Sequence, residues 1–105
     1  MSKPVSMLVT YIPKEGAEQQ LQALVEKHGT TLRKLGLITA EPVRLWKASD
    51  KRGHGESSHY FVEMFQWRDE EASGLAHQMP EVMAIWEPMG PILKDMKLSK
   101  LETLA

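Results

Sequence analysis

The sequence predicts a small α+β domain, in which helices cover one face of an antiparallel sheet. Two observations support this fold class. Segments rich in β-branched and aromatic residues lie near the start of the chain and as a pair in its middle, the last segment alternates like a strand, and helix-like patterns separate them. The chain has 105 residues, too few to build two hydrophobic cores, so we expect residues 1–105 to form a single domain.

The first strand and the first helix are indicated by two different patterns. Residues 5–12 are rich in β-branched and apolar side chains, and residues 13–16 are typical of a strand's end. Gly36 is suited to the left-handed residue that ends a helix, whereas Gly29 weakens the helix interior and allows a kink. We expect His28 to be a hydrogen-bonded core residue. The residues spaced along one face of this helix are Leu21, Leu24, Val25, His28, Leu32 and Leu35.

A hairpin is predicted in the middle of the chain. Residues 42–48 and 58–67 read as its strands, and the polar residues 50–55 as its turn. Because the helices of one chain can cover only one face of the sheet, we expect the other face to bind a second copy, giving a homodimer. The second strand is largely apolar on both faces, with Tyr60, Val62 and Met64 on one and Phe61, Phe65 and Trp67 on the other.

The last third of the chain predicts two further helical segments and a strand. Asp69 is suited to cap a helix whose first turn holds the two glutamates that follow it. Pro80 suits the first turn of the next helix, and Pro88 and Pro91 are expected to end it. Residues 96–104 then form an edge strand or a strand exchanged with a partner. The resulting order, β-α-β-β-α-β, is that of a ferredoxin-like fold. The apolar stripe of the later helix contains Val82, Ile85, Trp86 and Met89.

The composition excludes several functional classes. A net charge of −1 gives no attraction for nucleic acid or for an anionic membrane. There is no cysteine, so disulfides, thiolate catalysis and cysteine-ligated metals are excluded. His77 and Glu81 are four residues apart, but Pro80 interrupts the helix that would align them, so we expect no metal and no bound cofactor. No secretion signal or membrane span is evident, which favours a cytoplasmic location.

The RNA-recognition motif is an alternative with the same order of elements. Its third-strand aromatic signature is partly matched by Phe61 and Val62. However, Ser57 and Ser58 stand where that signature has a basic residue and a glycine, and Met64 stands where an aromatic ring would stack on a base. We therefore expect no RNA binding.

A family resemblance covers nearly the whole chain. Trp67, Asp69 and Ala72, followed by His77 and Pro80, resemble the W-x-D-x-x-A … A-H … P pattern of the antibiotic biosynthesis monooxygenase-like superfamily. These dimeric α+β barrel proteins include cofactor-free oxygenases, heme-degrading enzymes, isomerases and members without known activity. The resemblance implies a ferredoxin-like fold, a dimer and a ligand cleft between sheet and helices, and it implies a fold more firmly than a reaction.

The resemblance makes His77 the first catalytic candidate. The matching histidine hangs over the cleft, where an imidazole can take a proton from a phenol or an enol. The distance from Trp67 is one residue longer than the family's commoner spacing, so the matching position is either Ala76 or His77. The alternative for His77 is a structural role, with its ring bonded to a backbone carbonyl at a helix end. Trp86 occupies the place of the heme-degrading branch's histidine, so we expect no heme degradation.

Glu63 is the second catalytic candidate. It shares the apolar strand face of Phe61 and Phe65, where burial favours a protonated carboxyl that can donate or relay a proton. The alternative is an ion pair with Arg44 or Lys47 on the neighbouring strand. Ordinary core packing is the alternative for the apolar residues expected to form the pocket walls. These are Trp67, Trp86 and Met83.

Two hypotheses for function follow. In the first, the protein is an oxidoreductase that oxygenates a small aromatic or polyketide-like substrate without a cofactor, because an electron-rich anion can reduce dioxygen once a base has formed it. His77 would be that base and Glu63 a second acid. In the second, the same dimer is a non-catalytic module that binds a metabolite or a partner protein.

Overall fold

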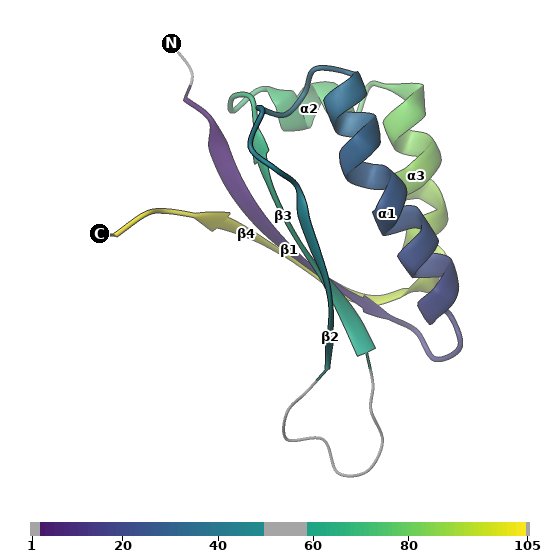
Figure 1. Ribbon diagram of the computed structural model, residues 1–105. Helices are drawn as coiled ribbons and strands as arrows, with labels where there is room; N and C mark the ends of the chain where they lie inside the picture. Colours follow the sequence, from purple (N-terminus) through teal and green to yellow (C-terminus); the bar gives the residue numbers. More distant parts are fainter. Residues whose placement is uncertain (1–2, 50–58, 105) are drawn as a thin grey trace.

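The computed structural model describes residues 3–49 and 59–104, and its helices cover one face of an antiparallel sheet, as predicted (Figure 1). The strand order is β2-β3-β1-β4, which is the ferredoxin-like arrangement. The predicted turn at residues 50–55 lies outside the described residues. In chain order the elements are β1 (Val5–Pro13), α1 (Glu18–Lys34), β2 (Arg44–Ser49), β3 (His59–Trp67), α2 (Ala72–Ala76), α3 (Pro80–Ile92) and β4 (Leu93–Leu101).

The helix α1 buries the face that its periodicity predicts. Leu21, Val25 and Leu32 lie in the core, and Gly36 has the left-handed φ of 72° expected after a helix end. The helix is continuous through Gly29, where a kink was allowed. A Cβ atom at Gly29 would lie 2.8 Å from Cγ1 of Val43, so glycine permits the close approach of the segment before β2.

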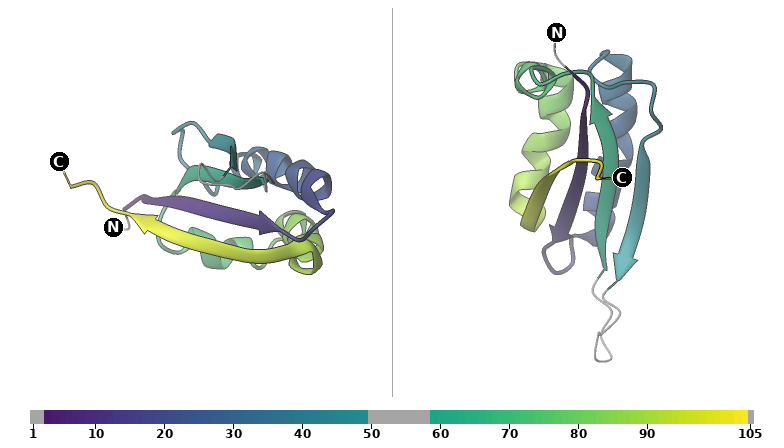
Figure 2. Two further views of the ribbon diagram at one scale, coloured as in Figure 1. Left: turned by 90° about the horizontal axis from the view of Figure 1, so that it is seen from below. Right: turned by 90° about the vertical axis from the view of Figure 1, so that its left-hand side faces the viewer.

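The strand β3 supplies the centre of the core. Its odd-numbered residues from Phe61 to Trp67 are buried against α1 and α3, and the side chains between them point to the face without helices. Val9 and Tyr11 of the neighbouring β1 lie on the same buried face. Figure 2 shows both helices on this side of the sheet and the opposite side bare. The two predicted faces of the strand are therefore confirmed.

The region after β3 differs from the prediction in two details. Oδ1 of Asp69 accepts hydrogen bonds from the backbone N–H groups of Glu71 and Ala72, both at 2.9 Å, but α2 begins only after the two glutamates. The prediction that prolines end the next helix is wrong, because α3 continues to Ile92. Burial of Met89, in the turn that contains both prolines, favours the helical path although each proline lacks an N–H group.

The last strand occupies an edge of the sheet, as predicted. It begins at Leu93, directly after α3, and pairs antiparallel with β1 of the same chain, where Val9 is opposite Leu98. Several of its apolar side chains on the helix side of the sheet, including Met96 and Leu98, remain exposed because the helices do not cover this edge. Within the two described segments, no helix is long and apolar enough to cross a membrane.

Candidate functional site

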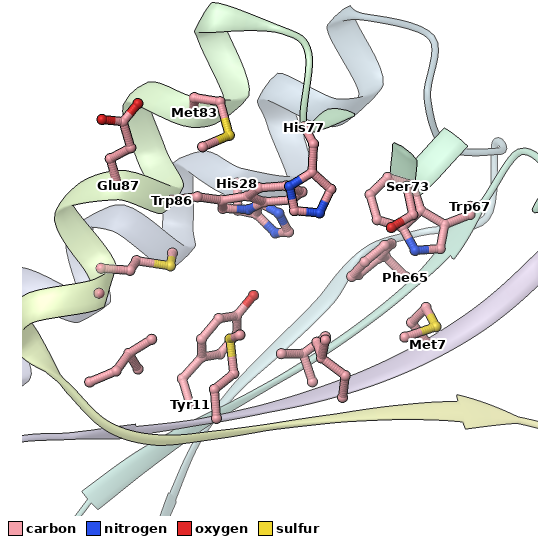
Figure 3. Close-up of a pocket in the computed structure, with 16 residues that line it drawn as sticks. Met7, Tyr11, His28, Phe65, Trp67, Ser73, His77, Met83, Trp86 and Glu87 are labelled. Carbon is pink, nitrogen blue, oxygen red and sulfur yellow. The ribbon is translucent and has the colours of Figure 1, made fainter. Parts of the chain in front are cut away.

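A cavity of about 330 Å³ lies between the helices and the strands β1, β3 and β4 (Figure 3). This volume is near the lower end of the range of about 300–1,000 Å³ that is usual for small-molecule sites. Aromatic and methionine side chains form most of its wall, and none of its lining residues is Lys or Arg. The lining residues are Met7, Val9, Tyr11, His28, Phe65, Trp67, Ser73, His77, Met83, Trp86, Glu87, Met89, Gly90, Leu93, Met96 and Leu98.

Four of the five site residues proposed from the sequence line this cavity. Trp67 comes from the end of β3, and Met83 and Trp86 come from α3. His77 follows α2 and is exposed at the rim. Glu63 does not line the cavity, because it is fully buried behind the wall.

The rim histidine packs against a tryptophan. The ring centroids of His77 and Trp86 are 4.7 Å apart, in an edge-on arrangement with 60° between the ring planes. The backbone N–H of His77 donates to the carbonyl of Ser73, but its ring has no hydrogen bond to the described residues. Among the described residues, the His77 ring therefore has no hydrogen bond to a backbone carbonyl, which was the structural alternative expected for it.

A buried polar group of three side chains lies deeper. Glu63 of β3 is 0% exposed, and its Oε1 accepts a 2.7 Å hydrogen bond from the hydroxyl of Tyr11 on β1. Nδ1 of His28 on α1 is 2.8 Å from the same oxygen and 3.1 Å from Oε2. An ionised carboxylate can only accept, and with Glu63 in this form the His28 ring donates to it through Nδ1–H.

The expected ion pair of Glu63 with Arg44 or Lys47 is absent and that prediction is wrong. The register places Leu45 opposite Glu63, so the neighbouring Arg44 points to the other face of the sheet. Nζ of Lys47 instead lies 2.9 Å from Oε1 of Glu18 at the start of α1. A hydrogen bond from Lys47 lowers the pKa of Glu18.

His28 is the functional candidate that sequence reasoning missed. Its prediction as a hydrogen-bonded core residue holds for Nδ1 but not for Nε2, which is buried without a partner among the described residues. His28 is 2% exposed and lines the cavity. A buried acceptor without a partner costs about 1–3 kcal/mol, so a ligand that supplies a donor there would recover this energy. The signal in the sequence that could have indicated His28 is that two polar residues, His28 and Glu63, were each predicted on an apolar face.

Aromatic rings surround this imidazole. Phe65 meets the His28 ring edge-on at 5.6 Å, and Trp86 lies 5.9 Å from it, so Trp86 contacts both histidines of the cavity. Figure 3 shows His77, Trp86 and His28 together beneath the helices, with the hydroxyl of Tyr11 directed toward them from the sheet. Burial, together with the charge and hydrogen bond of Glu63, raises the pKa of Tyr11 well above its ordinary value, so Tyr11 remains a donor.

The donor set does not suit a metal ion. Within residues 3–49 and 59–104, no three His, Cys, Asp or Glu side chains are grouped as metal ligands would be. Glu63 already has two partners, and the walls around His28 are aromatic. The arrangement is chemically suited to hold an apolar, planar molecule beside the imidazoles of His28 and His77.

Comparisons with known structures establish the fold class. No family model and no curated protein sequence matches the chain. A crystal structure of an antibiotic biosynthesis monooxygenase matches 96% of this chain and 99% of its own, with a TM-score of 0.71 and 15% identity. A dimeric ferredoxin-like protein of unknown function from Jannaschia matches 96% of this chain and 100% of its own, with a TM-score of 0.71 and 16% identity.

An oxygenase is also among the similar structures. SnoaB, a cofactor-independent oxygenase from Streptomyces nogalater, matches 95% of this chain and 92% of its own, with a TM-score of 0.67 and 11% identity. The chain therefore has the ferredoxin-like fold of the antibiotic biosynthesis monooxygenase-like proteins over its full length, and several proteins with this fold are dimeric. At these identities the likeness concerns the fold alone.

Proposed function

We propose that this protein is an enzyme that binds a small aromatic molecule in the cavity and oxygenates it without a bound cofactor. The observation that carries the proposal is an aromatic-walled cavity that contains two imidazoles and no cationic side chain. Such a site favours a flat apolar ligand and offers it a proton acceptor. The likeness in fold to SnoaB supports the same type of reaction.

The proposed reaction starts with loss of a proton. A base removes the proton from an enol or phenol, and the resulting electron-rich anion donates electrons to dioxygen. In an anthrone-like substrate, a CH₂ group between two rings becomes a C=O group. One oxygen atom of O₂ remains on the carbon, and the other leaves as water with the two hydrogen atoms of the CH₂ group. The substrate supplies all the electrons, so the protein needs only a base and a site that excludes water.

The cavity provides two candidates for the base. His77 is at the rim, where the ring meets both Trp86 and solvent, and His28 is in the wall with its Nε2 unpartnered. Glu63 is placed to act through His28 rather than on the ligand, since it does not line the cavity. Trp67, Trp86 and Met83 are the proposed walls against which the ligand packs.

The first experiment compares ligand classes. Purified protein is screened by thermal shift against anthrones, quinols, flavins and heme, and compounds that bind are followed by oxygen uptake. We expect stabilisation by anthrones or quinols, and oxygen uptake above the rate without protein. Stabilisation without oxygen uptake would favour the non-catalytic binding module, and stabilisation only by flavin or heme would contradict cofactor-free chemistry.

A pair of glycine variants tests the place of binding. Gly90 of α3 lines the cavity and Gly74 of α2 does not, and a Cβ atom at either position would meet no other atom within 4 Å. Gly90→Phe is therefore expected to fold normally and to weaken anthrone binding by about tenfold or more, because the ring occupies ligand space. Gly74→Phe is the matched control. Equal affinity for anthrone in both variants would place the ligand outside this cavity.

We also propose that two copies associate through the bare face of the sheet. Trp46 is 43% exposed there and Leu101 is 38% exposed, and the half-buried Val62 and Met64 lie between them. Exposed apolar side chains gathered on a sheet face without helices often mark an interface. Similar structures from Jannaschia and Bacteroides fragilis are dimeric, which supports a second copy of the chain as the occupant.

A further inference from the structure

We propose that His28 is the group that takes a hydroxyl proton from the ligand of this cavity, and that the ligand is a neutral weak acid such as a phenol or an enol. This assignment rests on the proposed function, because it presumes that the cavity binds an aromatic molecule. It adds the identity of the base, the groups that position it and the charge of the ligand.

The first argument is the tautomer of the ring. Glu63 can only accept hydrogen bonds when it is ionised, and Nδ1 of His28 lies within 3.1 Å of both of its oxygens. We therefore assign the ring proton to Nδ1, which leaves the lone pair of a neutral imidazole on Nε2. This is the nitrogen that has no partner among the described residues.

The second argument is the position of the lone pair. His28 is buried, yet its ring lines the cavity, so a ligand inside the cavity packs against this imidazole where bulk water is largely excluded. His77 lacks both features, because it is exposed at the rim and its ring has no carboxylate partner in the described part of the chain. A proton moved to His77 would be exchanged with solvent, whereas one moved to His28 stays beside the bound anion.

The third argument is the balance of charge. When the ligand's O–H bond breaks, its electron pair remains on oxygen and the proton forms a new bond with Nε2. The imidazolium is then between the Glu63 carboxylate and the ligand anion, and both interactions are strong in apolar surroundings. Glu63 is a positioning residue, since it holds the ring and does not line the cavity, and Tyr11 holds the carboxylate through its hydroxyl group.

The charge of the free ligand follows from the same cavity. No lysine or arginine lines it, so a ligand that arrives as a carboxylate or a phosphate would bury a charge without a cation beside it. A neutral phenol or enol avoids this cost, because its anion forms only together with the imidazolium. We therefore expect a preference for neutral hydroxy-aromatic ligands over anionic ones of the same size.

The test uses a matched pair of probes. 4-Nitrophenol has an acidic hydroxyl and an anion that absorbs visible light, whereas 4-nitroanisole has the same ring and no proton to give. We expect the protein to bind 4-nitrophenol about tenfold more tightly or better, as the spectroscopically distinct anion, because a charge-assisted hydrogen bond replaces the unpartnered nitrogen. Equal affinity for both probes overturns the role of His28 and leaves aromatic binding, and hence the proposed function, in place.

Variants separate the two histidines. Asparagine at position 28 can keep a donor for Glu63 but has no group at the place of Nε2, so His28→Asn should lose the preference for 4-nitrophenol and retain 4-nitroanisole. His77→Asn alters the cavity rim and should keep the preference for 4-nitrophenol, whatever its effect on the affinity for both probes. His59→Asn, outside the cavity, is the control that should behave like the parent. The reverse result, with the preference lost only in His77→Asn, overturns the assignment. Glu63→Gln is a second variant, in which we expect less bound anion at unchanged affinity for 4-nitroanisole.

The ring nitrogens give a test that needs no variant. Nitrogen-15 spectra of the histidine rings in the free protein should show His28 protonated at Nδ1 only. A ring protonated at Nε2 at neutral pH overturns the assignment. On addition of 4-nitrophenol, Nε2 of His28 should gain a proton, and the same change at His77 alone would also overturn it.

Discussion

The carboxylate of Glu63 is at the centre of the sheet, where it is fully buried and accepts hydrogen bonds from two side chains. Burial of a charge is favourable only if hydrogen-bonding partners replace the lost water. Tyr11 supplies one of these bonds and His28 the other, from a strand and a helix that both precede Glu63 in the sequence. The group therefore stabilises the contact of α1 with the sheet as well as orienting the imidazole.

The Tyr11→Phe variant tests this group by stability. A hydrogen bond to a charged group contributes about 1.5–3 kcal/mol, and we expect a loss of this size in the free energy of unfolding at neutral pH. The folded pKa of Tyr11 is raised above its ordinary value of 10.0, so its contribution is fully present below pH 10.0. Above that pH the unfolded chain releases a proton that the folded chain keeps, and stability falls.

The gap in unfolding free energy between the parent and Tyr11→Phe should therefore narrow as the pH rises above 10.0. Urea unfolding at several alkaline pH values measures this gap. Tyr60→Phe, which removes a phenol from the bare face of the sheet, is the control and should not show the same narrowing. A gap that stays constant would mean that Tyr11 titrates normally in the folded protein.

Two helices contain residues that helix propensity disfavours, and in both cases packing explains them. Gly29 interrupts an otherwise favourable α1, and Pro88 and Pro91 lie inside α3. Gly29 allows Val43 to approach the helix axis, and the turn of α3 that contains both prolines buries Met89. Local propensity is outweighed at these positions by the apolar contacts of the element.

The variant Gly29→Ala distinguishes propensity from packing. Alanine should stabilise the helix by about 1 kcal/mol, but its Cβ would lie 2.8 Å from a methyl group of the stiff Val43 side chain. Because overpacking costs about 1–3 kcal/mol, we expect a net loss of stability.

Adding Val43→Ala should make Gly29→Ala favourable, which is a coupling between the two positions that a double-mutant cycle of unfolding free energies measures. Gly74→Ala is a control, since it places a methyl group in open space within a helix. Additive effects of the Gly29 and Val43 substitutions would contradict a steric role for the glycine.

For the whole molecule, the two faces of the sheet have different proposed partners. The face toward the helices contains the cavity, and the bare face is proposed to bind a second copy. Because the faces are separate, association and ligand binding should be separable by mutation.

The Val62→Arg variant tests this separation. A charge in the middle of the bare face should convert a dimer into a monomer, since an unpaired charge is costly in an apolar interface. Light scattering at micromolar concentration measures the mass. Ala23→Arg, on the exposed surface of α1, is the control. The monomeric Val62→Arg variant should keep the affinity of the parent for 4-nitroanisole. A parent protein that is itself monomeric would contradict the proposed dimer.

The sequence by itself determined the elements and their buried faces. The helix spacing of Leu21, Val25 and Leu32 and the alternation in β3 were sufficient for the ferredoxin-like fold, because the period of apolar residues is a local property of helix and strand. The same alternation placed Glu63 on a buried face before its partners were known. The family-like pattern from Trp67 to Pro80 predicted a cleft at His77, and Trp86 and Met83, predicted as apolar walls, line the same cavity.

Only the tertiary structure decided which polar groups meet. His28 and Glu63 are 35 residues apart, and Tyr11 and Glu63 are 52 residues apart. Whether they touch depends on the strand register and on the rotation of α1 over the sheet, which no local period specifies. For the same reason the structure, and not the sequence, paired Lys47 with Glu18, placed the His28 ring at the cavity and left its Nε2 without a partner among the described residues.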